Sequence, residues 1–232
     1  CTYVISSNKK PERCYTMKTV PILNPELLEI LNRFIPIFEM IEFDKVAMDH
    51  DTSKRDEFCN DDYLKYIMSQ GKQHSGFPGM MVGCEISPSN FSCKNHDHWH
   101  EVTQPALAIK EDLQAWAGTR NNALSAVYPA GGFISWHNNA NAPGYNVLFT
   151  WSSEGDGQFE YVDPITNEHV VVPDVKGWQC KFGYYGTYDE QDKLMYHAAS
   201  TNCLRATIAY MFNPDETGRQ MAEMLIEDIS ES

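Results

Sequence analysis

The sequence has few basic residues for its length. Its 232 residues include 18 Lys and Arg against 32 Asp and Glu, which gives a formal net charge of −14 at pH 7. A surface of this charge repels phosphate backbones and anionic lipid headgroups, so we expect neither nucleic-acid binding through general charge nor a membrane partner. Long apolar runs are absent as well, and no segment predicts a transmembrane helix.

Paired cysteine motifs are also absent. Seven cysteines are scattered along the chain without a Cys-x-x-Cys pair, which argues against a zinc ribbon and a thioredoxin-like site. They are Cys1, Cys14, Cys59, Cys84, Cys93, Cys180 and Cys203. An odd set of free thiols fits a reducing compartment, so we expect an intracellular, cytoplasmic protein. No signal peptide is visible, and an N-terminal Cys1 is compatible with a fragment or a processed form.

Aromatic residues, by contrast, are plentiful. They make up 12% of the chain within a hydrophobic total of 42%, enough for a sizeable core. Capping residues and apolar spacing predict a helix from Asn24 that Pro36 limits, a short helix from Asp61, and a longer one from Gln104-Pro105 to Trp116. Residues 214–232 have the amphipathic spacing of a final helix.

Residues 123–213 have a different pattern. Eight short runs of β-forming residues alternate there with turns that contain Gly, Pro and Asn. The runs are 124–128, 133–137, 145–151, 157–162, 168–173, 178–185, 194–199 and 204–212. Eight antiparallel strands of this spacing predict a double-sheet jelly roll. The expected fold class is α+β, mainly β: one integrated domain with a helical and loop buttress (1–122), a jelly-roll core (123–213) and a C-terminal helix (214–232).

Three polar residues lie where this roll would direct them inward. His137 ends one predicted strand, His197 lies in another, and Arg205 follows His197 by eight positions. Because opposing strands of a roll meet across its interior, the two histidines can converge although they are distant in sequence. Imidazole suits a first-row transition metal, and a nearby arginine offers a bidentate clamp for a carboxylate ligand.

These residues and their neighbours resemble the 2-oxoglutarate- and Fe(II)-dependent dioxygenases, most closely the prolyl-hydroxylase-like branch. The resemblance covers about residues 124–212 and suggests a double-stranded β-helix. It is carried by Tyr128-Pro129-Ala130-Gly131-Gly132, His137-Asn138-Asn139, Gly155-Asp156-Gly157-Gln158-Phe159-Glu160, Asp163-Pro164, His197 and Arg205-Ala206-Thr207. The segment 177–181 is similar to phage-encoded and marine oxygenase-like proteins.

The resemblance implies an oxygenase that hydroxylates an unknown small-molecule or peptide substrate. It implies Fe(II) and the co-substrate 2-oxoglutarate, with ascorbate as an optional addition. The distal carboxylate of 2-oxoglutarate would be held by Arg205, with the Thr207 hydroxyl beside it, and Tyr128 would help to hold the co-substrate. Neither the substrate nor the oligomeric state can be inferred from these residues.

The implied metal ligands and catalytic residues are His137, Asn139 and His197, and the middle one departs from the family pattern. The family places Asp or Glu at that position, and here the next acid after His137 is Glu154. A carboxamide oxygen can ligate a metal but brings no negative charge. Its loss costs on the order of a hundredfold in Fe(II) affinity. A catalytically silent jelly-roll binding or structural protein, for example in a virion, is therefore the alternative.

Two further interpretations compete with this one. A halogenase-like site, in which chloride takes the place of the carboxylate, would carry Gly or Ala at the position of Asn139. The stretch from His96 to Glu101 would direct His96, His98 and His100 to one face if it formed a strand, and such a face could bind zinc for a hydrolase. A polar surface segment or active-site rim is the plainer interpretation of that stretch.

Overall fold

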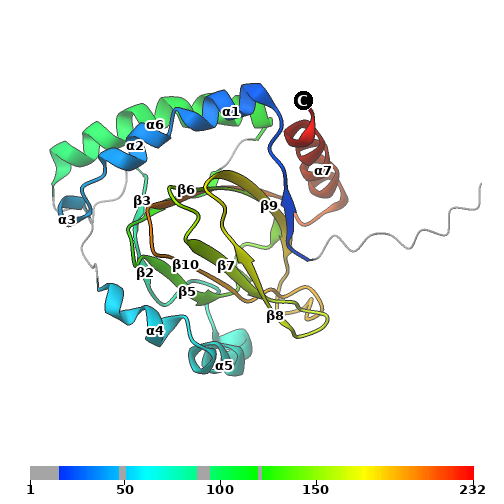
Figure 1. Cartoon of the computed structure of the whole chain (residues 1–232). Helices are drawn as coiled ribbons and strands as arrows, with labels where there is room; N and C mark the ends of the chain where they lie inside the picture. The colour runs from blue at the N-terminus through cyan, green and yellow to red at the C-terminus, as the bar shows by residue number, and fades with distance from the viewer. Residues whose placement is uncertain (1–15, 47–50, 88–94, 120–121) are drawn as a thin grey trace, which may run out of the picture.

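Two antiparallel sheets that face each other form the centre of the protein (Figure 1). The computed structural model describes residues 16–46, 51–87, 95–119 and 122–232. One sheet has six strands in the order β1-β9-β6-β11-β4-β3, and the other has five in the order β2-β5-β10-β7-β8. The strands from β4 to β11 divide equally between the sheets, an arrangement compatible with the predicted jelly roll.

The strand boundaries follow the turn residues of the sequence closely. The short strands are β1 (Lys18–Val20), β2 (Met81–Val82) and β3 (Cys84–Glu85). The others are β4 (Asn122–Tyr128), β5 (Phe133–His137), β6 (Gly144–Ser152), β7 (Gly157–Val162), β8 (His169–Pro173), β9 (Gly177–Tyr185), β10 (His197–Thr201) and β11 (Arg205–Phe212). The strand predicted at 194–199 begins only at His197, because residues 194–196 belong to the loop that precedes it.

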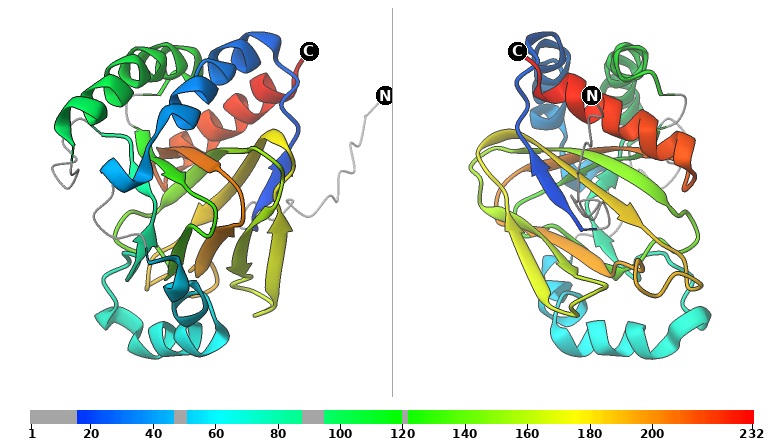
Figure 2. Two further views of the ribbon diagram at one scale, coloured as in Figure 1. Left: turned by 60° about the vertical axis from the view of Figure 1, so that its left-hand side comes forward. Right: turned by 90° about the vertical axis from the view of Figure 1, so that its right-hand side faces the viewer.

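Helices cover the outer faces of both sheets (Figure 2). The long elements α1 (Pro25–Asn32), α6 (His96–Ala117) and α7 (Glu216–Ser230), together with α2 (Ile35–Met40) and α3 (Phe43–Val46), lie on the side of the six-stranded sheet. On the opposite side, α4 (Arg55–Phe58) and α5 (Asp61–Gln70) lie against the five-stranded sheet. The short helix predicted from Asp61 is α5, and it lies with α4 against the five-stranded sheet, away from the other helices.

Pro36 and Pro105 do not lie at the helix boundaries that the sequence predicted. The first helix ends at Asn32, and Pro36 lies in the first turn of the separate helix α2, where its missing N–H needs no partner. Pro105 lies inside α6. The helix begins nine residues earlier, at His96, because Asn95 caps it by accepting a hydrogen bond from the backbone N–H of His98.

The main apolar core lies between the six-stranded sheet and its helices. It joins residues of α1 and α6, such as Leu27 and Leu113, to sheet residues such as Phe149 and Ile208. No helix in the described ranges is both long enough and apolar enough to cross a lipid bilayer. Of the seven cysteines, Cys59, Cys84, Cys180 and Cys203 are free thiols, and Cys1, Cys14 and Cys93 lie outside the described residues.

Candidate active site

An interior cavity of about 420 Å³ lies between the two sheets. Its walls include all six residues that the sequence singled out for a metal and a co-substrate: His137, Asn139, His197, Arg205, Thr207 and Tyr128. His197 and Thr201 begin and end β10, about 13 Å apart along a strand. Because a short turn connects Thr201 to Arg205, the histidine end and the arginine end of the cavity lie apart along the strand direction.

A β-bulge brings His137 to the inner face of its sheet. On β5 and β10, His137 pairs with His197 and Ile134 pairs with Ala199, so two residues of β5 oppose Ala198 alone. In an unbroken strand, residues 134 and 137 would point to opposite faces. The extra residue lets Ile134 and His137 both line the cavity, while the Trp136 indole packs outward and donates to the Cys59 carbonyl.

The two imidazoles of the histidine end are held so that both present an unprotonated nitrogen. Nδ1 of His137 lies 2.7 Å from the carbonyl oxygen of Ser135, and Nδ1 of His197 lies 3.2 Å from that of Met195. A carbonyl can only accept, so each Nδ1 donates and each Nε2 keeps its lone pair. The ring centroids are 4.1 Å apart. Metal-binding histidines typically donate one ring N–H to a second partner in this way, which leaves the other ring nitrogen unprotonated for the metal.

Burial keeps both histidines neutral. It lowers the pKa of His137 to about 4 and also lowers the pKa of His197 well below its ordinary value. The nearby imidazole of His74 lowers the pKa of His137 further. Tyr185 stacks on His197 with 4.5 Å between ring centroids, which fixes the orientation of this ring. Neutral imidazole is the form that ligates a metal.

Asn139 lies beside this pair in a left-handed backbone conformation, with φ of 52°. Asparagine is one of the few residues that accept such a φ readily. Its backbone N–H donates to the Gly76 carbonyl, and its amide nitrogen lies 3.4 Å from Nε2 of His197. A half turn of the amide would place its oxygen where its nitrogen is now. The side chain therefore lies where a third ligand would be expected.

The histidine end offers a divalent metal two imidazole nitrogens and one amide oxygen as ligands. Both imidazoles are neutral with an unprotonated Nε2, and the Asn139 amide lies 3.4 Å from Nε2 of His197. In the part of the chain that the structure describes, no group of three or more His, Cys, Asp and Glu side chains is placed to hold a metal ion. The ligand set of His137, His197 and Asn139 therefore has one negative charge fewer than two histidines with a carboxylate.

The arginine end is held by charged side chains. The Arg205 guanidinium is buried, donates from Nη1 to the Thr207 hydroxyl at 2.9 Å, and lies 5.6 Å from the centroid of the Tyr128 ring. Its Nε donates at 2.7 Å to Oδ2 of Asp174, and Nζ of Lys181 lies 3.0 Å from the other oxygen of the same carboxylate. The predicted proximity of Arg205, Thr207 and Tyr128 is present, together with an unpredicted ion cluster.

No site role was predicted from the sequence for Asp174, Lys181, Tyr185 or His74. The sequence places Lys181 inside the predicted strand 178–185, and the structure shows that every residue from Gln179 to Tyr185 is buried. A lysine in such a run needs an anionic partner in the interior. Nothing in the local pattern around Asp174 names it as that partner, since the contact depends on how the loop after β8 returns to the sheet.

The histidine-rich stretch before position 101 is helical, so the strand-based zinc interpretation is wrong. Residues at i, i+2 and i+4 of a helix do not share a face. His96 and His100 are exposed, whereas His98 is buried and its Nε2 accepts a hydrogen bond from the backbone N–H of Glu42 at 3.1 Å. His98 thus ties α6 to the loop before α3.

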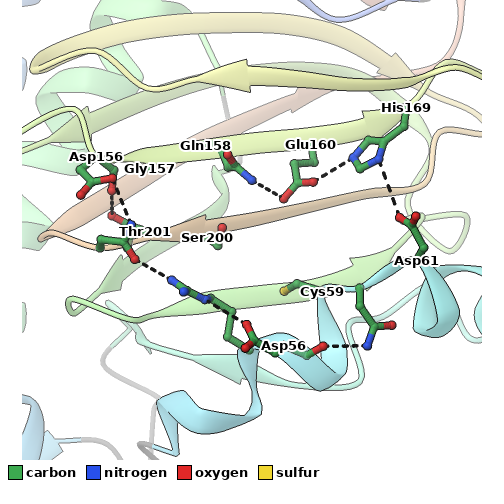
Figure 3. A pocket seen from close by; sticks show the side chains of 13 residues that line it. Asp56, Cys59, Asp61, Asp156, Gly157, Gln158, Glu160, His169, Ser200 and Thr201 are labelled. Carbon is green, nitrogen blue, oxygen red and sulfur yellow. Dashed lines mark hydrogen bonds and ion pairs between the residues drawn. The ribbon is translucent and has the colours of Figure 1, made fainter.

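A second pocket, of about 510 Å³, lies on the outer face of the five-stranded sheet beneath α4 and α5 (Figure 3). His169 bridges two acids there: its Nε2 is 2.8 Å from Glu160 and its Nδ1 is 3.9 Å from Asp61. Arg55 and Asn202 continue the network with a 2.7 Å hydrogen bond. These groups partner one another and connect α4 and α5 to the sheet, so the interior cavity remains the candidate active site.

Comparisons with known proteins show similarity to solved structures only. No protein family and no curated protein matches the chain. A Pseudomonas putida prolyl-4-hydroxylase is 15% identical, with a TM-score of 0.32 over 66% of this chain and 88% of that one. OsALKBH1 is 15% identical, with a TM-score of 0.30 over 65% and 90%. A rice dioxygenase for auxin oxidation is 13% identical, with a TM-score of 0.33 over 81% and 70%. Similarity this weak does not decide function, which must come from the side chains.

Proposed function

We propose that this chain is an Fe(II)- and 2-oxoglutarate-dependent oxygenase built on a double-stranded β-helix, and that it hydroxylates a small molecule or a peptide. One observation carries the proposal: two buried, neutral histidines with unprotonated Nε2 atoms share one cavity with a buried arginine. A site that binds a metal at one end and a carboxylate at the other suits a 2-oxo acid with a distal carboxylate.

The residues of this chain would bind and orient the reactants. His137 and His197 would hold the metal through Nε2, and the Asn139 amide oxygen would complete the protein ligands. Arg205 and Thr207 would bind the distal carboxylate of 2-oxoglutarate. When bound, iron and 2-oxoglutarate supply the oxidising chemistry, and the protein supplies position and shelter from water.

The cavity rim indicates a substrate with an apolar part. Phe77 and Met211 line the cavity, yet 61% and 37% of their surfaces are exposed. Exposed apolar side chains at the entrance of a cavity commonly contact a ligand. We therefore propose that an apolar portion of the substrate rests on Phe77 while its reacting carbon faces the two histidines.

Anaerobic calorimetry with Fe(II) or Mn(II), with and without 2-oxoglutarate, tests the proposal. We expect metal binding that 2-oxoglutarate strengthens, together with succinate formation when oxygen and substrate are supplied. His197→Ala should lower metal affinity by about a hundredfold and abolish turnover, because it removes one of two imidazoles. His169→Ala is the matched control, since it removes a histidine outside the cavity and should change neither quantity. Undiminished turnover in His197→Ala would exclude this assignment.

A catalytically silent binding protein is the second candidate, and Asn139 favours it. In the structure the amide nitrogen of Asn139 faces Nε2 of His197, the contact expected if the amide simply satisfies a buried imidazole. Binding of neither the metal nor 2-oxoglutarate to the wild-type protein would support this candidate and direct the search to protein partners.

A further inference from the structure

The carboxylate of Asp174 is the centre of a buried ion cluster at the arginine end. It receives hydrogen bonds from Nε of Arg205 at 2.7 Å, Nζ of Lys181 at 3.0 Å and Nε2 of Gln179 at 3.0 Å. The side chains of Asp174 and Lys181 are fully buried, and that of Arg205 is 3% exposed. Three donors from β9 and β11 thus share one carboxylate that follows β8.

The charges of this cluster do not cancel. Arg205 and Lys181 bring two positive charges and Asp174 brings one negative charge, and within the described residues Asp174 is the acid paired with either cation. One positive charge is therefore left in excess. An uncompensated charge in a protein interior is costly, and an anion that entered the cavity would offset it.

Unused hydrogen-bond donors of the cluster and its surroundings support an anionic ligand. Nε and Nη1 of Arg205 are engaged by Asp174 and Thr207, and no described residue accepts from Nη2. Thr150 pairs with Thr207 across β6 and β11, is buried, and has a hydroxyl without a partner among the described residues. One unused donor of Arg205, which lines the cavity, and one hydroxyl on the strand beside Thr207 thus lack partners.

We propose that Lys181 is a positioning residue that keeps the arginine end of the cavity cationic and so makes the cavity select a carboxylate ligand. Lys181 does not line the cavity; it acts through Asp174. With Lys181 present, Asp174 is shared between two cations and Arg205 retains a net attraction for an anion. Without Lys181, Asp174 and Arg205 would form a neutral pair. The inference rests on the proposed function where it takes that anion to be the distal carboxylate of 2-oxoglutarate.

The titration of Lys181 makes this role visible in a pH profile. Burial lowers its pKa to about 8, the Arg205 charge lowers it too, and Asp174 acts in the opposite direction. The neighbouring Cys180 thiol has its pKa raised to about 12 by burial and stays neutral. Burial acts to raise the pKa of Asp174, but Arg205 and Lys181 outweigh it and hold this pKa below its usual value. Loss of the Lys181 proton would therefore remove the excess charge.

Calorimetry with glutarate, a dicarboxylate without a keto group, tests the inference on the full chain without added metal. Lys181→Met should weaken glutarate binding by about tenfold, because it removes one charge at short range. Adding Asp174→Asn to that variant restores the count of one positive charge and should return the affinity to within about threefold of wild type. Lys176→Met is the matched control, since Lys176 pairs with Glu154 on the surface at 3.0 Å. It should leave the affinity unchanged.

A wild-type pH profile keeps the test informative even if a variant does not fold. The affinity for glutarate should fall by about tenfold between about pH 7 and about pH 9.5, as Lys181 loses its proton. A flat profile, an unchanged Lys181→Met affinity in folded protein, or no glutarate binding by the wild type would each overturn the inference. Charge-dependent glutarate binding without metal binding or 2-oxoglutarate turnover would support it while excluding the proposed oxygenase.

Discussion

The histidines at one end of the interior cavity and the arginine at the other are buried alike, but the two ends are held in opposite ways. At the histidine end, main-chain carbonyls fix two neutral imidazoles, and Asn139 adds no charge. At the arginine end, side chains carry three formal charges that hold one another. One end is uncharged until a cation arrives, and the other is charged before any ligand arrives. A cavity with this polarity orients a ligand whose anionic group lies far from its metal-binding group.

Removal of Asp174 should have the largest effect on the free energy of unfolding, and so give the clearest contrast between the two ends of the cavity. Asp174→Ala leaves Arg205 and Lys181 buried without an anion, and we expect a loss of about 3–5 kcal/mol in the free energy of unfolding. Asn139→Gly at the histidine end keeps the left-handed backbone accessible and should change the same quantity by less than about 1 kcal/mol. Urea denaturation of both variants measures the contrast. Equal small losses would show that the charged cluster is not structurally important.

Acid should affect the two ends in different pH windows. The pKa of His137 is about 4 in the folded protein against about 6.5 in an unfolded chain, so the unfolded state binds the proton first. Stability should fall by about 3 kcal/mol for this group as the pH drops from about 6.5 to about 4. The pKa of Asp174 is depressed, so its contribution is lost only at lower pH.

Urea denaturation at several pH values, with a chelator present, measures these windows. His137→Gln, which does not titrate there, should show a shallower decline between about pH 6.5 and about pH 4 than the wild-type protein. A decline of the same slope in both proteins would mean that His137 is not held neutral by the fold.

A carboxylate at position 139 would give the histidine end a charged side chain, as the arginine end already has. Asn139→Asp adds a negative charge beside the two imidazoles and should raise Mn(II) affinity by on the order of a hundredfold. Aspartate also accepts a positive φ more readily than most residues, so the backbone should tolerate the change. Calorimetry with Mn(II) gives the affinity. No gain would indicate that Asn139 does not face the metal position, and would strengthen the silent alternative.

Removing single unpaired hydroxyls should have the smallest effect. The hydroxyls of Tyr185 and Tyr210 are both buried without a partner among the described residues, but Tyr185 lines the cavity and Tyr210 belongs to the core beneath the helices. Tyr185→Phe and Tyr210→Phe should each stabilise the protein by about 1 kcal/mol, because each removes an unsatisfied buried donor.

Thermal unfolding followed by circular dichroism measures both tyrosine variants. Weaker 2-oxoglutarate binding in Tyr185→Phe but not in Tyr210→Phe would show that the cavity ligand uses the hydroxyl at the histidine end. A destabilised Tyr185→Phe would contradict the expectation and place a water molecule on that hydroxyl.

The strands between residues 123 and 213 could be predicted from the sequence because each of them lies between strong turn residues. The positions of His137 at the end of one strand and of Arg205 near the start of another followed from that pattern and from the family resemblance, whereas His197 was predicted inside its strand and begins it. Reasoning failed where one local signal outweighed another: Pro105 suggested a helix start, although the Asn95 cap begins the helix nine residues earlier. It also missed Asp174, whose role depends on a long-range contact with Lys181 and Arg205 that no local spacing encodes.

The β-bulge in β5 has a consequence for how this site can be gained or lost over evolutionary time. Two residues of β5, Ser135 and Trp136, lie opposite Ala198, and this extra residue is taken up by the bulge, so Ile134 and His137 both face inward. Deleting the codon of either residue would restore a regular strand in which the histidine lies two positions after Ile134, so the imidazole would still face the cavity. The metal position can therefore survive the loss of one residue between Ile134 and His137, and such a deletion would change only the side chains that pack on the outer face.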